Sequence, residues 1–340
     1  MSAHQTNSKD QIMTPKFKYA AALIPWANPG DRFLRAGYRE AFSPLQRLKH
    51  AASLGVLDGI EMMYPAELNE ENVQEVKRLL SDAELALAIM GIPISSERQF
   101  SHGTLTSRDP SVRRAAIDRV KAGMDVCAEL GGDKVMFFLG QDGCDYSLEV
   151  DYEEAWHCMG ESIAEMASHR DDVKVCLEYK PYEPRRHIFL HDVGTALHLV
   201  DQINADNVGI VLDTGHAFMA NENLGESIWL LHRARRLYHF HFNDNYRSCD
   251  DDMVVGSVHF MPFVEAMYWL KRIGYRDWIS LDLFPYREDP DMAVIESIAY
   301  LKRLDEIVDE IGLETITGLL QKNDGAQTLR VINRHVLGTG

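Results

Sequence analysis

The sequence predicts an α/β protein, more specifically a (β/α)8 TIM barrel with a C-terminal helical extension. Eight short apolar runs alternate along the chain with longer segments that carry apolar residues at three- and four-residue spacing, which is the helical period. Eight strand–helix units in roughly 250 to 290 residues match the size of such a barrel. An open doubly wound sheet is the alternative, and it is disfavoured because no Gly-rich nucleotide loop follows the first run.

The eight predicted strands are short runs dominated by apolar residues, so they have the length of strands and not of helices. They span residues 18–26, 59–63, 85–93, 134–140, 173–180, 208–215, 237–244 and 278–284.

Helix boundaries are visible between these runs. Ser43 and Asp109 each precede a proline, which is typical of a capped first helical turn. Gly55, Gly131 and Gly274 each follow a periodic segment, where glycine commonly ends a helix.

The two ends of the chain lie outside the eightfold pattern. Residues 1–16 are polar and lack a hydrophobic core, so we expect a disordered tail and no secretion signal. Residues 17–311 are the expected catalytic barrel. Residues 312–340 are expected to form an extension that either packs on a neighbouring subunit or caps its own barrel.

Composition excludes several classes of partner. The formal charge of −17 argues against binding to nucleic acid or to an anionic membrane surface. No apolar stretch reaches about 18 residues, so no membrane span is expected. The five cysteines are an odd number without CxxC spacing, which is typical of a reduced, cytoplasmic protein.

Potential metal ligands occur at the ends of four consecutive predicted strands. They are Glu178, Asp213, His241 and Asp282. Catalytic groups of such barrels gather at the C-terminal ends of the strands, so these four side chains are expected to surround one divalent ion.

A second set of potential ligands follows on the same rim. His216 lies three residues after Asp213, and Asp250 and Asp252 lie in the loop after the seventh strand. These three are expected to hold a second ion, with a carboxylate shared between the two. Ligands that are mostly oxygen, with one imidazole per site and no cysteine, suit Mn²⁺, Mg²⁺ or Co²⁺ better than a structural Zn²⁺.

The run of residues 178–185, EYKPYEPR, resembles the ExKPxEPR motif of xylose isomerases. Other segments resemble the same family in the same order, and the likeness extends over roughly residues 17–310. They are TSRDPSVRRAA at 106–116, GQDGCDY at 140–146, DTGH at 213–216, DDDMVVG at 250–256 (like DxDLxxG) and DLFPYR at 282–287 (like DxxPxR).

The resemblance implies an aldose–ketose isomerase that works by a metal-assisted hydride shift. Glu178, Asp213, His241 and Asp282 would hold the first ion, and Asp213 would bridge to a second ion held by His216, Asp250 and Asp252. Lys180 would bind the carbonyl oxygen of the sugar. The resemblance and the tail together suggest a homodimer or homotetramer.

The chain also departs from the family pattern. Xylose isomerases have an acid where His241 stands, and the chain is here more similar to the L-rhamnose isomerase branch. The segment MMYPAEL at 62–68 has no ring-opening histidine, and Phe138 stands where a tryptophan walls the sugar site. His102 is a candidate for the missing histidine, whereas the specific sugar is not carried over from the family.

The remaining candidate sugar contacts are side chains near the predicted strand ends. They are Trp26, Phe100, Glu183 and Arg287, together with His216. No cluster of Arg and Lys or Gly-rich loop is evident at these ends, so the expected sugar is unphosphorylated, although Arg185, Arg186 and Arg247 could serve a phosphate.

Two other activities of the superfamily stay open. One is a lyase that cleaves 3-oxo-glycosides of the C-glycoside type, and the other is a sugar epimerase with paired carboxylate bases on one metal. Lys180 favours isomerisation over the lyase, because the lyase would need an unprotonated base such as a neutral histidine to abstract a proton from carbon. The Asp250–Gly256 motif suggests a second metal and so disfavours the epimerase.

Overall fold

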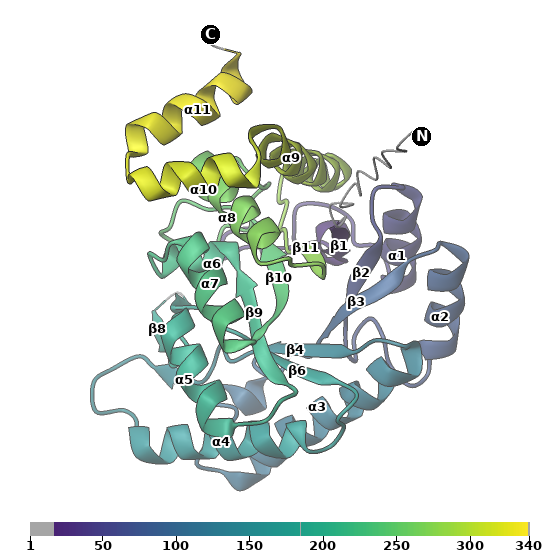
Figure 1. Ribbon diagram of the computed structural model, residues 1–340. Helices are drawn as coiled ribbons and strands as arrows, with labels where there is room; N and C mark the ends of the chain where they lie inside the picture. Colours follow the sequence, from purple (N-terminus) through teal and green to yellow (C-terminus); the bar gives the residue numbers. More distant parts are fainter. Residues whose placement is uncertain (1–16, 184, 339–340) are drawn as a thin grey trace, which may run out of the picture.

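The computed structural model describes residues 17–183 and 185–338 and contains a closed barrel of eight parallel strands (Figure 1). The predicted fold class is therefore confirmed, including all eight strands. In barrel order these are β1 (Lys18–Ala22), β11 (Trp278–Leu281), β10 (Leu237–Phe242), β9 (Val208–Asp213), β6 (Lys174–Glu178), β4 (Lys134–Phe138), β3 (Ala86–Gly91) and β2 (Gly59–Met63).

Helices surround the barrel and connect successive strands (Figure 1). They are α1 (Pro44–Ser53), α2 (Val73–Asp82), α3 (Pro110–Leu130), α4 (Tyr152–Ala167), α5 (Val193–Ile203), α6 (Thr214–Met219), α7 (Leu224–Ala234), α8 (Phe260–Arg272) and α9 (Pro290–Ile311). Two short 3-10 turns, Ile24–Trp26 and Arg98–Phe100, lie in the loops after β1 and β3.

The predicted helix boundaries have a clear physical basis. Ser43 and Gln46 form a capping box at the start of α1, and the Asp109 carboxylate accepts a hydrogen bond from the Ser111 amide at the start of α3. Gly131 ends α3 with φ of 89°, a left-handed conformation that glycine adopts without steric cost.

A small antiparallel sheet joins two loops at the C-terminal rim of the barrel. It contains β5 (Gly143–Cys144), β8 (Arg186–Ile188) and β7 (Tyr182–Glu183), in that order. Its strands come from the loops after β4 and β6. Just before this sheet, the Lys180 amide donates to the Leu190 carbonyl at 2.9 Å. The backbone at Lys180 is therefore hydrogen-bonded to the chain that follows the sheet.

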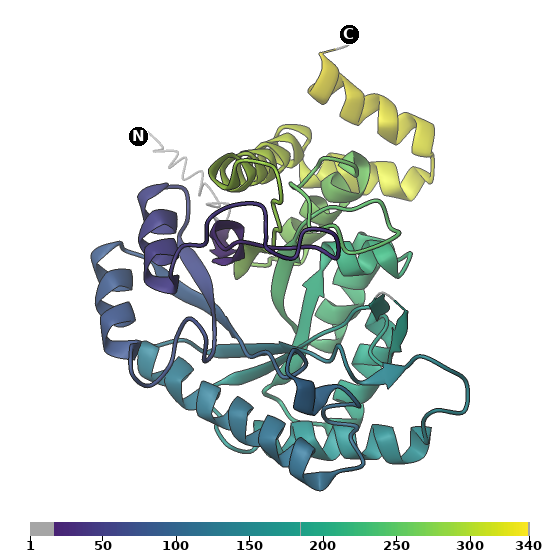
Figure 2. The ribbon, with the colours of Figure 1, turned by 180° about the vertical axis from the view of Figure 1, so that it is seen from behind.

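The C-terminal helical extension consists of α10 (Leu313–Lys322) and α11 (Gly325–Leu337). Both ribbon views place it outside the ring of helices, beside α8 and α9 (Figures 1 and 2). Ile316, Leu319 and Ile332 are its buried side chains. The expected disordered tail, residues 1–16, lies outside the described residues. Within the described ranges, every helix is too short or too polar to cross a membrane.

Candidate metal centre

The structure brings together the four potential ligands at the ends of β6, β9, β10 and β11. Glu178, Asp213, His241 and Asp282 each offer a donor atom, and these atoms all lie within 4.8 Å of one another. We call this set the first metal group. His241 Nδ1 is 2.9 Å from Glu178 Oε1 and 3.9 Å from Asp213 Oδ2.

The strand register explains this convergence. Asp213 and His241 are paired residues on the neighbouring strands β9 and β10. Adjacent strands lie about 4.8 Å apart, so paired side chains on one face of a sheet contact each other. Glu178 ends the next strand along, and Asp282 directly follows β11.

A second group forms one layer further toward the loops. Asp213, His216 and Asp250 offer donor atoms within 4.8 Å of one another, and we call them the second metal group. His216 Nε2 lies 3.1 Å from Asp250 Oδ2. Asp213 is held at both oxygens, because the His216 amide donates to Oδ1 and Asn243 Nδ2 donates to Oδ2, each at 2.8 Å.

Asp252 was expected in the second group but lies apart from its close cluster. It is buried, and it lines a separate pocket of about 200 Å³. Tyr246, Phe284 and Tyr286 also line this pocket. The negative charges of Asp250, Asp282 and Asp213 still reach Asp252, and together with burial they raise its pKa well above the usual value.

The electrostatics of the two groups are those of buried acids crowded together. Burial, with repulsion from Glu178 and Asp213, raises the pKa of Asp282 to about 8, and burial raises that of Asp213 to about 6. Burial acts against the charged form of His216, but Asp213 and Asp250 attract it more strongly and raise its pKa to about 9.

Unpaired donor atoms indicate that the two groups bind a ligand. Within the described chain, Asp282 Oδ1, Asp250 Oδ1 and His216 Nδ1 are buried and have no hydrogen-bond partner. Buried polar atoms are nearly always paired, so each of these atoms calls for a ligand. Carboxylates and imidazoles with free lone pairs suit divalent ions such as Mn²⁺, Mg²⁺ or Co²⁺. The residues present therefore fit the expected metal.

Lys180 lies beside the second metal group. Its Nζ is 2.6 Å from Glu183 Oε1 and 2.8 Å from Asp250 Oδ2, and it sits 5.4 Å from the centre of the Phe138 ring. Burial alone would lower the pKa of Lys180, but attraction by Asp250 and Glu183 outweighs burial and raises it. The ammonium is thus a fixed positive charge next to the candidate ligands.

The expected sugar contacts divide into two sets. Phe138 is half-buried and its ring centre lies 6.2 Å from that of His216, so it forms one wall of the centre. Trp26 and Phe100 are fully buried and have other partners: Trp26 Nε1 donates to Asp291 Oδ1 at 2.8 Å, and the Arg119 guanidinium lies 5.4 Å from the Phe100 ring.

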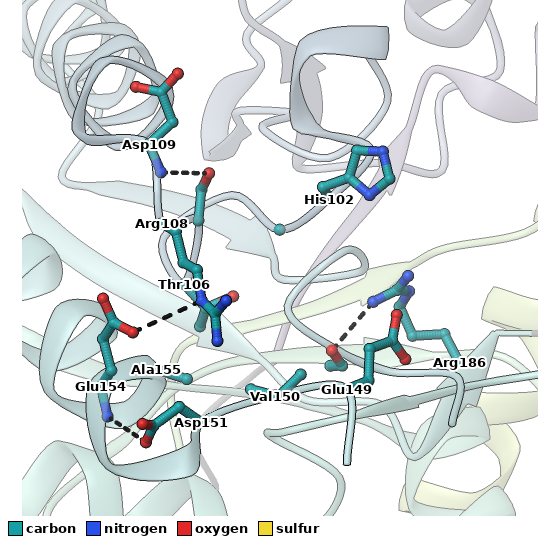
Figure 3. Close-up of a pocket in the computed structure, with 13 residues that line it drawn as sticks. His102, Thr106, Arg108, Asp109, Glu149, Val150, Asp151, Glu154, Ala155 and Arg186 are labelled. Atoms are coloured by element: carbon teal, nitrogen blue, oxygen red, sulfur yellow. Dashed lines mark hydrogen bonds and ion pairs between the residues drawn. The ribbon is translucent and has the colours of Figure 1, made fainter. Parts of the chain in front are cut away.

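Two further expected contacts are exposed on the rim. The Arg287 guanidinium stacks on Tyr38, 4.6 Å from the ring centre. His102 lines a pocket of about 420 Å³ between the loop before α3 and the start of α4 (Figure 3). The pocket walls are strongly polar, with Arg108 facing Glu154 across 3.7 Å and Arg186 on another side. His102 therefore lines a cavity to which no residue of either metal group contributes.

Two residues at the centre had no part in the sequence-based site. Glu61 on β2 has its Oε1 2.8 Å from His239 Nε2 and 3.1 Å from His241 Nε2. The available signal was a carboxylate in the middle of the apolar run GIEMM. Asn243, which holds Asp213, had no signal beyond its place directly after β10.

Comparison with known proteins agrees with the barrel fold. A family model described as "Xylose isomerase-like TIM barrel" matches residues 48–304. The xylose isomerase of Thermus thermophilus is 25% identical over 293 residues, which cover 82% of this chain and 76% of that protein.

Solved structures with the same fold include sugar epimerases. A D-tagatose 3-epimerase-like protein superimposes with a TM-score of 0.70 at 21% identity, covering 86% of this chain and 99% of that one. A 3-keto-D-glucoside 4-epimerase from E. coli gives 0.65 at 17% identity, covering 85% and 100%. A D-allulose 3-epimerase from Methylomonas sp. gives 0.65 at 18%, covering 85% and 98%. At these identities the likeness concerns the fold alone.

Proposed function

Because this chain belongs to the xylose isomerase-like TIM barrel family, we propose that it is a divalent-metal-dependent sugar isomerase that interconverts an aldose and a ketose. The activities named for its relatives support the broader class, sugar isomerase or epimerase. The observation that carries the narrower proposal is the buried ammonium of Lys180, which lies 2.8 Å from Asp250 of the second metal group.

The two metal groups supply the ligands for the proposed ions. Glu178, Asp213, His241 and Asp282 would hold one ion, and Asp213, His216 and Asp250 the other, with Asp252 close enough to respond to their charge. Bound Mn²⁺, Mg²⁺ or Co²⁺ would act as a Lewis acid that polarises the sugar oxygens.

The proposed reaction moves one hydrogen between adjacent carbons. The hydrogen at C2 of the open-chain aldose passes to C1 with its electron pair, while the hydroxyl proton passes from O2 to O1, so no atom is gained or lost. Negative charge grows on the carbonyl oxygen during this transfer, and Lys180 donates a hydrogen bond to that oxygen. Phe138 would pack against the apolar face of the sugar and keep water away.

The substrate is proposed to be an unphosphorylated sugar. Lys180, beside the second metal group, already has two carboxylate partners. On the rim, the Arg186 guanidinium donates to the Gln141 and Gly143 carbonyls at 3.3 and 3.1 Å. A phosphate dianion would therefore be repelled by the many carboxylates of the centre and, among the described residues, would find few unpaired cations there.

A second candidate is a sugar epimerase, and one observation favours it. Glu178 and Asp282 both belong to the first metal group, so two carboxylates flank one proposed ion. Such a pair can remove a proton from one face of a carbon and return it to the other. An epimerase of this kind has no need of the Lys180 ammonium or of a second ion.

Isotope retention separates the two candidates. The enzyme is screened with Mn²⁺ against common and branched aldoses and ketoses, and the best substrate is then converted in D₂O. We expect ketose formation with little deuterium at C1 or C2, because a hydrogen that moves with its electron pair does not exchange with solvent. Near-complete deuterium incorporation at the altered carbon, with an epimer as product, would replace the isomerase with the epimerase.

A further inference from the structure

His241 lies between two carboxylates, one at each nitrogen of its ring. Nδ1 is 2.9 Å from Glu178 Oε1 in the first metal group. Nε2 is 3.1 Å from Glu61 Oε1 on the far side of the ring. A neutral imidazole has one nitrogen that can bind a metal and one that carries a proton, so the two carboxylates compete to decide which is which.

We propose that Glu61 is a positioning residue, which accepts the Nε2 proton of His241 and so presents Nδ1 as the metal-binding atom. This proposal rests on the proposed function only in requiring that the first metal group hold an ion. A histidine that binds a metal commonly donates its other ring proton to a carboxylate, which fixes the orientation of the ring and makes it a better ligand.

The position of Glu61 supports a dedicated role. It is 2% exposed and stands on β2, which is separated from β10 in the barrel by β1 and β11. Its side chain therefore reaches across the barrel interior to the histidines. An isolated carboxylate in such a place is strongly disfavoured unless it is paired and hydrogen-bonded, and Glu61 has both imidazoles as partners.

His239 completes the arrangement. It lies two residues before His241 on β10, and the two rings meet edge to face with centres 5.2 Å apart. His239 Nε2 is 2.8 Å from the same Oε1 atom of Glu61. One carboxylate oxygen thus accepts from two imidazoles, so a sideways movement of Glu61 away from His241 would also break its bond to His239.

The same three residues could instead hold a metal themselves, because donor atoms of Glu61, His239 and His241 also lie within 4.8 Å of one another. An ion there would need the Nε2 lone pair of His241. The proton would then sit on Nδ1, and the first metal group would lose its only nitrogen ligand. The first group has four donors against three, and the free Asp282 Oδ1 lies in it, so His241 is assigned to the first group.

The test measures Mn²⁺ binding directly, by the loss of the free-ion signal in electron paramagnetic resonance. Glu61→Gln keeps the shape of the side chain but removes its charge. We expect Mn²⁺ affinity at the first metal group to fall about 10- to 100-fold, the usual effect of removing such a partner. The control is Glu67→Gln, which neutralises another buried carboxylate near β2. Glu67 pairs with Arg47 at 2.5 Å and accepts from the Met63 amide at 2.9 Å. Glu67→Gln should leave Mn²⁺ affinity within about threefold of the wild-type value.

A second readout reports the ring itself. In protein labelled with ¹⁵N-histidine and loaded with Mg²⁺, long-range ¹H–¹⁵N spectra identify the protonated nitrogen, and His241→Asn assigns the signal. The wild type should show Nε2–H at His241, and Glu61→Gln should lose or mix this tautomer. Thermal melts of both glutamine variants check that each is folded, and any shared loss of stability is thereby separated from the loss of metal.

The outcomes distinguish a failure of the proposed metal-dependent function from a failure of the positioning role of Glu61. A wild-type protein that binds no Mn²⁺ would refute the metal-dependent function itself. If the wild type binds Mn²⁺ and Glu61→Gln matches Glu67→Gln in affinity and tautomer, the positioning role is wrong. If Glu61→Gln and His239→Gln each lose a whole bound ion while Asp282→Asn keeps it, Glu61 and His239 are direct ligands, and the proposal is overturned as well.

Discussion

Replacing Lys180 with methionine tests the proposed chemistry most directly. Methionine keeps most of the length of the side chain but removes the ammonium of a residue that is only 5% exposed. Water therefore has little room to replace it. Loss of one fixed donor to a developing oxyanion typically costs about 10²- to 10³-fold in turnover, or about 2.7 to 4 kcal/mol. We expect kcat to fall by this factor.

Metal binding should survive this substitution. Asp250 loses its contact with Lys180 but keeps His216 at 3.1 Å, and the first metal group does not include Lys180. Mn²⁺ affinity is therefore expected to stay within a few-fold of the wild-type value. The assay combines kcat and KM for ketose formation with a Mn²⁺ titration of the same preparation.

Lys134→Met is the matched control. Lys134 is also buried, and its Nζ lies 2.7 Å from Asp277 Oδ2. It stands at the start of β4, the opposite end of the barrel from the candidate centre. Its loss should lower thermal stability while kcat of the folded protein changes little. Turnover within threefold of wild type in Lys180→Met, or an equal fall in Lys134→Met, would remove Lys180 from the reaction.

Three further predictions follow from the centre and the extension. Chelation should abolish turnover and Mn²⁺, Co²⁺ or Mg²⁺ should restore it, whereas full activity in a metal-free preparation would contradict the proposed role of the ions. Without metal, His216 has a pKa of about 9 and Asp282 a pKa of about 8, so both hold protons at pH 7 that a bound cation must displace. Mn²⁺ affinity should therefore rise from about pH 6 to pH 9, and calorimetry in buffers of different ionisation enthalpy should measure the released protons. A flat pH profile of affinity would show that these groups do not bind the ion. We also predict a homodimer or homotetramer that needs α10 and α11, so light scattering should show smaller particles after removal of residues 313–340, and a monomeric full-length protein at micromolar concentration would contradict this.

The barrel could be predicted because its signal is local and repeated. Each strand is a short apolar run, and caps such as Ser43 and Asp109 act within one helical turn. The ends of consecutive parallel strands meet at one rim whatever the details of packing. That rule alone places Glu178 and Asp213 in one cluster.

Other parts of the site depend on contacts that no local pattern encodes. Trp26 and Phe100 look like sugar-stacking rings in the sequence, but their surroundings are set by α9 and by Arg119 on α3. Asp252 follows Asp250 by two residues, but its backbone has φ of 45°, which turns the chain there. Side chains two residues apart point to the same side only where the backbone is extended.

Glu61 is placed to compensate for the departure from the family pattern at His241. Xylose isomerases are expected to have an acid at the position of His241, so the histidine removes one negative charge from the first metal group. Glu61 returns a carboxylate 3.1 Å behind the imidazole, where it can take up the ring proton. The charge lost from the ligand shell thus reappears on its far side, and the histidine and Glu61 have to be treated as one unit.

A His241→Asp variant should accordingly tolerate loss of the Glu61 charge, because an aspartate ligand has no ring proton to be held. Equal Mn²⁺ affinity in His241→Asp and in His241→Asp combined with Glu61→Gln is the expected result, and a further 10-fold loss in the double variant would separate the two residues.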